Sequence, residues 1–293
     1  MPAARKDATF KDSLGVTIHY HMWSHPSPKA VVQLVHGVGE HSLRYEHVAA
    51  ALVAAGYEVW ADDHRGHGQT GLEQWAGDTT RLGRLGKGGH RAAVDAVHRL
   101  SKLIKAARLS IPFVLFGHSW GSFISQMLLD EYPVEYDLVV LSGSAYRVLT
   151  GMNAAPLNAR FKRSVPEPTG YEWLSRDPVV VAAAAADPLM VATPLMKLFG
   201  IRDTLRLLGK PRIGLADEHD VPLLLIVGSD DPVGGERSVR RLAEAYLSRA
   251  RLTDVSVIVY DGARHEVLNE TNADEVIADV IAWLDARIPT GTA

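Results

Sequence analysis

The sequence predicts an α/β fold, in which helices cover both faces of a mostly parallel, doubly wound sheet and one helical insertion interrupts the pattern. Three observations lead to this prediction. Apolar segments alternate with helical segments, the apolar segments are unbroken runs, and one long stretch has no strand pattern. Unbroken apolar runs are typical of strands that are buried on both faces of a parallel sheet. Repeated strand–helix units build such a sheet.

The apolar runs give the expected strands, at residues 30–36, 57–61, 112–116, 137–141, 222–227 and 255–260. Before the first run, residues 9–23 alternate around Gly15 and predict a β-hairpin. Between the runs, apolar residues at helical spacing predict helices over residues 43–55, 90–107, 236–247 and 274–287. Ligands of such sheets bind at the carboxyl ends of the strands, so the functional residues are expected there.

Residues 146–220 break the alternation, because proline, alanine and leucine dominate and no strand is evident. We therefore expect a core of residues 1–145 and 221–293 and a helical cap of residues 146–220. Residues 182–186 form an alanine run that predicts a short helix. In residues 194–210 an apolar stripe of Leu195, Met196, Phe199, Leu205 and Leu208 has basic residues beside it. This segment either packs on the core, or lines an acyl tunnel or touches a lipid surface.

Composition narrows the class of protein. The formal net charge of -3 gives no reason to expect nucleic acid as a partner. The absence of cysteine excludes disulfides, thiolate metal sites and a cysteine nucleophile, and it fits a reducing cytoplasm. The N-terminal residues MPAARKDATF lack the apolar region of a signal peptide. No apolar run is long enough to span a bilayer, so we expect a cytoplasmic protein.

The strongest chemical signal is Gly117–His118–Ser119–Trp120–Gly121, between a predicted strand and a predicted helix. A GxSxG sequence in this setting places the serine on a tight strand-to-helix turn with its hydroxyl exposed. The glycines fit because a Cβ atom at either position would crowd the turn. Ser119 is therefore the candidate nucleophile.

A serine hydroxyl needs a base to remove its proton, and an acid must orient that base. Two later strands are followed by suitable residues in the expected chain order of serine, acid, histidine. His265 follows the last strand and is the candidate base. Asp231 is the candidate acid, with Asp230 as its alternative, because neighbouring residues point in different directions and only one should face His265. Glu266 is expected to be a structural or exposed group rather than a base.

Two backbone amides are the candidates for an oxyanion hole. The loop after the first core strand, which contains His36, Gly37 and Val38, supplies one donor, and the residue after the nucleophile supplies the other. We therefore assign the N–H groups of Val38 and Trp120.

Several histidines near these motifs raise the alternative of a metal site. They are His36, His41, His47, His64 and His67. His64 and His67 lack a matching pair of ligands at a known metal spacing. We expect them to brace loops, and we expect neither a metal nor a cofactor.

Taken in order, the segments HGVGEHSLRY, DDHRGHGQT, GHSWGS, GSDDPV and GARHEVLNE resemble the monoacylglycerol lipase and lysophospholipase branch of the α/β-hydrolases, from about Val31 to Glu270. The resemblance implies Ser119, Asp231 and His265 as the triad and Val38 and Trp120 as oxyanion donors. It also implies a cap with an apolar passage for one acyl chain and no need for a cofactor. The chain differs in having Trp120, where relatives usually carry methionine or another unbranched residue.

The resulting expectation is a serine carboxylester hydrolase that works through an acyl-enzyme on monoacylglycerols, lysophospholipids or similar single-chain esters. Its partners would be small-molecule or lipid esters, with peripheral membrane contact through the cap and no obligate protein partner. One alternative keeps the triad but acts on an amide, lactone, carbamate or thioester, since a fold does not fix a substrate. Another is a non-catalytic ligand-binding protein on the same scaffold.

Overall fold

The computed structural model describes residues 5–153 and 155–288 of the chain. The strands are β1 (Arg5–Lys11), β2 (Thr17–Trp23), β3 (Ala30–Val35), β4 (Tyr57–Asp62), β5 (Phe113–His118), β6 (Leu138–Ser142), β7 (Leu223–Gly228) and β8 (Val255–Tyr260). Within the described residues they form one eight-stranded sheet in the order β1-β2-β4-β3-β5-β6-β7-β8. The α/β fold predicted from the sequence is confirmed.

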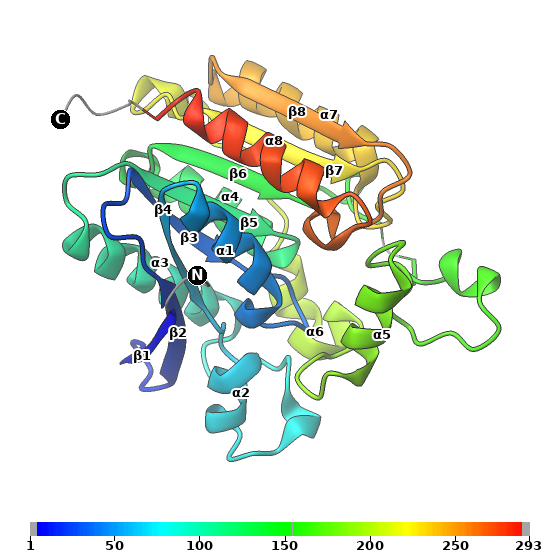
Figure 1. The fold of residues 1–293 in the computed structure, drawn as a ribbon. Coiled ribbons are helices and arrows are strands. Elements are labelled where there is room, and N and C mark those ends of the chain that lie inside the picture. The colour runs from blue at the N-terminus through cyan, green and yellow to red at the C-terminus, as the bar shows by residue number, and fades with distance from the viewer. Residues whose placement is uncertain (1–4, 154, 289–293) are drawn as a thin grey trace.

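The sheet is parallel from β4 to β8, whereas β1 and β2 form an antiparallel hairpin that joins the sheet beside β4. The hairpin was predicted around Gly15, and it begins at Arg5 rather than at Thr9. Parallel neighbours need crossover connections, which the helices supply. The carboxyl ends of β3, β5, β6, β7 and β8 consequently lie at one end of the sheet, on the side where residues of the 146–220 segment are found (Figure 1).

The α-helices are α1 (Glu46–Ala54), α2 (Gly68–Gln74), α3 (Gly89–Ala107), α4 (Trp120–Glu131), α5 (Pro178–Ala186), α6 (Leu195–Leu205), α7 (Gly235–Ala245) and α8 (Ala273–Asp285). Short 3-10 helices are η1 (Ser42–Tyr45), η2 (Thr79–Arg81), η3 (Pro133–Glu135), η4 (Phe161–Ser164), η5 (Leu215–Asp217) and η7 (Val267–Asn269), and η6 (Tyr246–Ala250) is a π-helix. The helix predicted from residue 43 therefore begins as a 3-10 turn. The sequence did not reveal α2, because Gly68 and Gly71 are poor helix formers.

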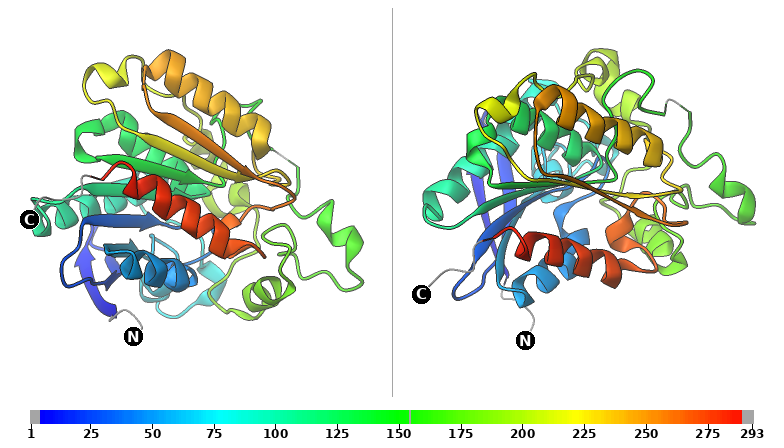
Figure 2. Two further views of the ribbon diagram at one scale, coloured as in Figure 1. Left: turned by 45° about the horizontal axis from the view of Figure 1, so that its top comes forward. Right: turned by 90° about the horizontal axis from the view of Figure 1, so that it is seen from above.

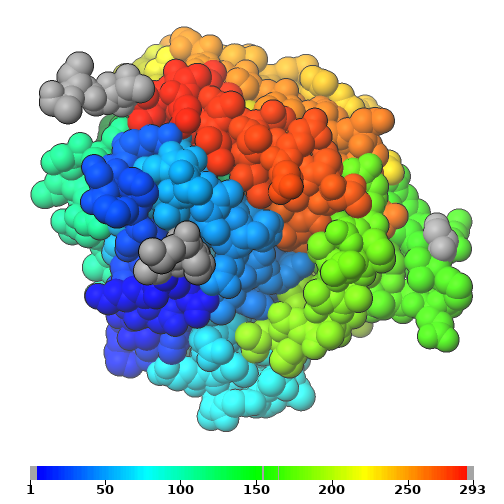
Figure 3. Space-filling view, in the orientation of Figure 1, coloured from blue at the N-terminus to red at the C-terminus, as the bar shows by residue number. Residues whose placement is uncertain are grey.

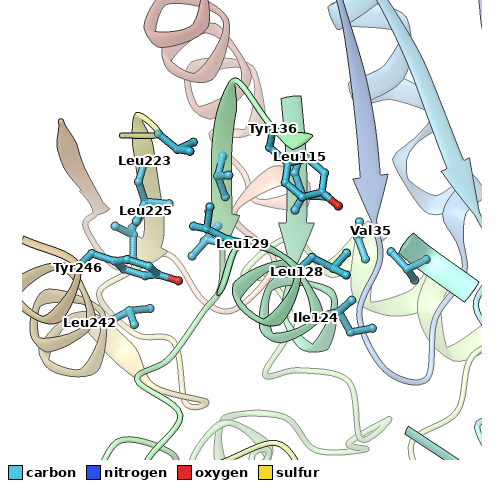
Figure 4. Close-up of a cluster of buried hydrophobic side chains, with 14 of the residues drawn as sticks. Val35, Leu115, Ile124, Leu128, Leu129, Tyr136, Leu223, Leu225, Leu242 and Tyr246 are labelled. Carbon is cyan, nitrogen blue, oxygen red and sulfur yellow. The ribbon is translucent and has the colours of Figure 1, made fainter. Parts of the chain in front are cut away.

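Helices cover both faces of the sheet (Figure 2). On one face, α3, α4 and α7 pack over apolar side chains of the strands, and Figure 4 shows part of this cluster around Leu128, Leu225 and Tyr246. On the other face, α1 and α8 cover a second cluster, which includes Leu52 and Trp283. The strands between the layers are fully buried from β3 to β7, which explains their unbroken apolar runs.

The described part of residues 146–220 contains helices and turns, and no strand is found in it. Helix α5 includes the alanine run, as predicted. Helix α6 is kinked at Gly200, whose φ of 76° is not helical. The predicted apolar stripe is only partly buried: Leu195 and Phe199 pack against the core, whereas Met196, before the kink, and Leu205, after it, are 59% and 57% exposed. In the space-filling view the segment borders the loops before α8 (Figure 3).

No helix in residues 5–153 and 155–288 is both long and apolar enough to cross a bilayer. The expectation that the chain has no signal peptide concerns its first ten residues. The first four of them lie outside the described residues.

Candidate active site

Ser119 lies in a strained turn between β5 and α4. Its φ of 53° and ψ of -122° are unusual for a residue with a Cβ atom, and its N–H donates to the Ser142 carbonyl oxygen at 2.9 Å. The two flanking glycines have a steric cause. A Cβ atom on Gly121 would lie 2.0 Å from the Val35 carbonyl oxygen, and one on Gly117 would lie 2.3 Å from Ser125 Oγ. The turn therefore requires both glycines.

A continuous chain of hydrogen bonds joins Ser119, His265 and Asp231, which follow β5, β8 and β7. Ser119 Oγ lies 2.8 Å from His265 Nε2, and His265 Nδ1 lies 2.9 Å from Asp231 Oδ1. A carboxylate can only accept, so the proton belongs on Nδ1, and Nε2 is left to accept from the serine hydroxyl. All three residues are buried. The three residues singled out in the sequence are thus brought together.

Only one of the two adjacent aspartates faces His265. Asp231 Oδ1 also accepts the Val233 N–H at 2.8 Å, which fixes its orientation. The Asp230 carboxylate points elsewhere: it is 49% exposed and pairs with Arg160 at 2.8 Å. Of the two alternatives that the sequence left open, Asp231 is the one in contact with the histidine.

The surroundings of His265 favour its charged form. Burial disfavours an imidazolium, but the Asp231 carboxylate more than offsets this and raises the pKa of His265, with smaller contributions from Glu266 and Glu40. Its neighbour His118 behaves in the opposite way. Burial and the proximity of His265 hold the pKa of His118 well below its usual value, so this ring stays neutral.

The loop after β3 passes directly beside Ser119. A Cβ atom on Gly37 would lie 3.0 Å from Ser119 Cβ, and Val38 comes next in the chain. Neither the Val38 amide nor the Trp120 amide donates to a protein acceptor in the hydrogen bonds found among the described residues. Both N–H groups thus remain available beside the serine.

A buried network that the sequence did not reveal supports this loop. Glu40 Oε1 accepts from the Gly37 N–H at 2.5 Å and from the Tyr45 hydroxyl at 2.8 Å, while Glu40 Oε2 accepts from Arg44. Arg44 also donates two hydrogen bonds to Glu266, the residue after the histidine. Burial and the nearby Glu266 raise the pKa of Glu40. The network joins the loop after β3 to the loop of His265, and the only signal in the sequence was the motif HGVGEHSLRY itself.

The histidines weighed as a metal site brace loops instead. His36 stacks on His64 with ring centroids 3.8 Å apart. His36 Nε2 accepts from the His64 N–H, so His36 Nδ1 carries the proton and donates to the Gly37 carbonyl oxygen. Within the described residues, no group of three or more histidines and acids is placed to hold a metal ion.

The side chain of Trp120 fills the space between this histidine cluster and α6. Its ring contacts those of His64 and His67 and lies 4.9 Å from Phe199. Its Nε1–H donates to His90 Nδ1 at 3.4 Å. The bulky residue after the nucleophile is therefore accommodated away from the Ser119–His265 contact.

Comparison with known proteins gives consistent results. Residues 26–272 match the family described as serine aminopeptidase, S33. The chain is 34% identical to a monoacylglycerol lipase of Mycolicibacterium smegmatis, over 98% of this chain and 99% of the relative. It is 29% identical to human monoglyceride lipase, over 91% and 86% of the two chains.

Among solved structures, a thermostable carboxyl esterase from Bacillus coagulans superposes with a TM-score of 0.81 at 25% identity, covering 98% of this chain and 99% of the other. A monoglyceride lipase from Saccharomyces cerevisiae has the same fold, with a TM-score of 0.73 at 21% identity over 98% and 96% of the two chains. The resemblance inferred from the motifs is confirmed. The chain belongs to the serine aminopeptidase S33 family of serine hydrolases with the α/β-hydrolase fold.

Proposed function

We propose that this protein hydrolyses carboxylic esters through an acyl-enzyme on Ser119, and that its substrates are monoacylglycerols, lysophospholipids or similar single-chain esters. The observation that carries the proposal is the hydrogen-bonded chain from Ser119 through His265 to Asp231. The substrate class is supported by the relatives, which include monoacylglycerol lipases and a carboxyl esterase.

In the first half-reaction, Ser119 Oγ attacks the ester carbonyl carbon while His265 Nε2 takes the hydroxyl proton. The carbonyl oxygen becomes an oxyanion, which accepts hydrogen bonds from the amides of Val38 and Trp120. When the intermediate collapses, the ester C–O bond breaks and His265 returns the proton to the leaving alcohol. Asp231 stabilises the imidazolium throughout this step.

The second half-reaction repeats these steps with water as the nucleophile in place of the serine hydroxyl. His265 Nε2 takes a proton from water, the hydroxide oxygen bonds to the acyl carbon, and the oxyanion forms again between the same amides. Ser119 Oγ then leaves with the proton from His265, and the fatty acid is released. His265 accepts and returns each proton that moves in the two half-reactions. The proposed steps therefore involve no cofactor.

We further propose that residues 146–220 act as a cap over this site and that the exposed part of α6 contacts a lipid surface. Val191 N–H donates to the Gly39 carbonyl oxygen at 2.8 Å, and His41 pairs with Asp187, which supports a position of the segment beside the site. Ile201 is 71% exposed. The same helix also exposes Met196, Leu205, Lys197 and Arg202. Apolar groups beside basic ones suit an anionic membrane surface, reached from the cytoplasm.

Replacement of the nucleophile tests the chemistry. We expect Ser119→Ala to lower kcat for p-nitrophenyl esters on the order of 10⁶-fold and to abolish labelling by a fluorophosphonate probe, while circular dichroism stays unchanged. Ser110→Ala, at an exposed loop position, is the control and should retain full activity. A Ser119→Ala variant that keeps most of its activity would overturn the proposal.

A panel of acyl donors tests the substrate class, because the family description also covers aminopeptidases. Esters, thioesters, lactones, carbamates and amides of matched chain length should give the highest kcat/KM for the ester. A much higher value for an amide would select the alternative reaction. Wild-type protein that binds these compounds without turnover or probe labelling would point to a binding protein.

Sedimentation with anionic vesicles tests the lipid contact. We expect Ile201→Asp to reduce the bound fraction, because a charge replaces an apolar side chain within the basic patch. Val134→Asp is a matched control, since Val134 is 56% exposed but lies in η3, before β6. Equal binding by both variants and the wild type would reject a membrane contact through α6.

A further inference from the structure

A short piece of the 146–220 segment, residues 171–176, runs along the loop that carries His265. The Glu266 N–H donates to the Leu174 carbonyl oxygen at 2.8 Å, and the His265 N–H donates to that of Trp173 at 3.4 Å. The Arg264 guanidinium donates to two further carbonyl oxygens of the piece, those of Glu172 and Ser175. These backbone contacts fix the piece relative to the histidine.

The side chain that this piece presents to the histidine is an indole. The ring of Trp173 lies 4.8 Å from that of His265, centroid to centroid, and the planes are inclined by 32°. Trp173 is partly exposed, whereas His265 is 1% exposed, so the indole covers the imidazole on one side. The ring of His118 lies 4.8 Å away as a second neighbour.

An indole at this distance discriminates between the two protonation states of the imidazole. The face of an indole carries negative charge density and attracts a cation within about 6 Å of its centroid. A neutral imidazole receives much less of this attraction. Above the acid limb of the pH profile, His265 is neutral in the resting enzyme and becomes an imidazolium when it takes the serine or water proton. The indole therefore stabilises the transition states more than the resting enzyme.

We infer that Trp173 is a positioning residue for the reaction: through its ring face it stabilises the imidazolium form of His265, and it holds the imidazole in the plane between Asp231 and Ser119. The inference rests on the proposed function of the triad. It gives residues 146–220 a part in the chemistry, in addition to their proposed part as a cap over the site.

Other charged groups also face His265 and must stay unchanged in a test. They are Asp231 from the loop after β7, Glu40 from the region after β3, and Glu266 from the same loop as the histidine. Arg44 pairs with both glutamates and lies near His118. His118 stays neutral because its pKa is well below the usual value. A substitution at Trp173 alters none of these side chains, so a shift in the titration of His265 would report the loss of the indole.

The experiment compares Trp173→Phe and Trp173→Leu across pH, with a soluble p-nitrophenyl ester as substrate. In Trp173→Leu the imidazolium form of His265 loses the indole that stabilises it in the transition states. We therefore expect this variant to lower kcat about tenfold with little change in KM. The acid limb of kcat/KM should move to lower pH. Trp173→Phe keeps a weaker aromatic face and should fall between the wild type and Trp173→Leu in both respects.

Trp75→Leu is the matched control. Trp75 also has a cation over its ring, Arg81 at 3.7 Å, but its neighbours are in α2 and the loop that follows. This variant should leave the acid limb and kcat unchanged. A merely structural role of Trp173 would instead lower activity equally at every pH, with no shift of the limb and no rescue by phenylalanine, and that result would overturn the inference.

The failure of this inference can be told apart from failure of the proposed function. If the wild type depends on Ser119 for hydrolysis but the acid limb is the same in all Trp173 variants, only the role of Trp173 is rejected. If Ser119→Ala remains active, the proposed mechanism itself is rejected. A pH titration of indole fluorescence, taken as wild type minus Trp173→Phe, adds a readout without turnover and should follow the protonation of His265.

Discussion

At the scale of single residues, the sequence left two adjacent aspartates as candidates for the acid of the triad. Asp231 touches His265, and Asp230 pairs with Arg160. We expect Asp231→Asn to lower kcat about 10⁴-fold, because an amide stabilises neither the required tautomer nor the imidazolium. Asp230→Asn is the matched control and should keep kcat within about twofold, since it removes an exposed ion pair. Steady-state kinetics at one pH would decide, and equal losses in both variants would contradict the assignment.

At the scale of elements, the turn between β5 and α4 depends on close backbone approach. A Cβ atom on Gly121 meets the carbonyl oxygens of Val35 and His36 at 2.0 and 2.4 Å, and backbone atoms cannot move aside cheaply. We expect Gly121→Ala to lower the free energy of unfolding by about 3 kcal/mol or more. Gly170→Ala is the control: it meets no atom within 4 Å, but its φ of +96° is strained, so the loss should be about 1 kcal/mol. Urea denaturation measures both, and similar losses would contradict the steric explanation.

Also at this scale, a buried ion pair joins the N-terminal hairpin to the loop after β4. Arg65 donates to Asp12 and to the carbonyl oxygens of Leu85 and Lys87, and both charged side chains are almost fully buried. Arg65→Gln should cost about 3–5 kcal/mol, because Asp12 keeps a buried charge without a partner.

The control for Arg65→Gln is Arg240→Gln, which breaks the exposed pair with Glu236 in α7. That substitution should change the free energy of unfolding by no more than about 0.5 kcal/mol. If the two variants have the same urea midpoint, the buried pair contributes nothing beyond an exposed one.

At the scale of the whole molecule, the buried histidines determine how stability responds to acid. Burial lowers the pKa of His67 and of His90 to about 4, it also lowers the pKa of His98, and it holds those of His36 and His118 well below the usual value. The unfolded chain, whose histidines titrate near 6.5, therefore binds more protons than the folded chain below that pH. Stability that is present above pH 6.5 is lost as the pH falls towards 4.

Three groups act in the opposite direction. The pKa of His265 is raised, so its stabilising contribution is present below pH 6.5 and is lost as the pH rises through its folded value. Burial raises the pKa of Asp130 to about 6, and burial near Glu266 raises the pKa of Glu40. Both carboxyl groups likewise favour the folded state at lower pH. The five histidines with a lowered pKa outnumber these three groups, so we expect the protein to be less stable at pH 5 than at pH 7.5.

His90→Gln tests this balance, because a glutamine can accept the Trp120 hydrogen bond without titrating. Urea unfolding of the wild type should show a clear loss of stability between pH 7.5 and pH 5. The loss should be smaller by about 2 kcal/mol in the variant, which no longer has a group titrating near 4 in the folded state and near 6.5 in the unfolded state. His25→Gln, at a half-buried position before β3, is the control and should keep the wild-type dependence. A variant with the full wild-type dependence would show that His90 does not contribute.

The sequence by itself determined the features that depend on neighbours along the chain. Runs such as residues 222–227 predicted the strands because burial on both faces demands unbroken apolar residues, and GxSxG predicted the turn at Ser119 because only glycine fits beside it. Only the tertiary structure decided which aspartate meets His265, that Glu40, Arg44 and Glu266 form one network, and that Trp173 covers the imidazole. Arg44 and Glu266 are 222 residues apart in the chain. Contacts of this kind are set by how strands and loops are brought together in space, which local patterns of residues do not encode.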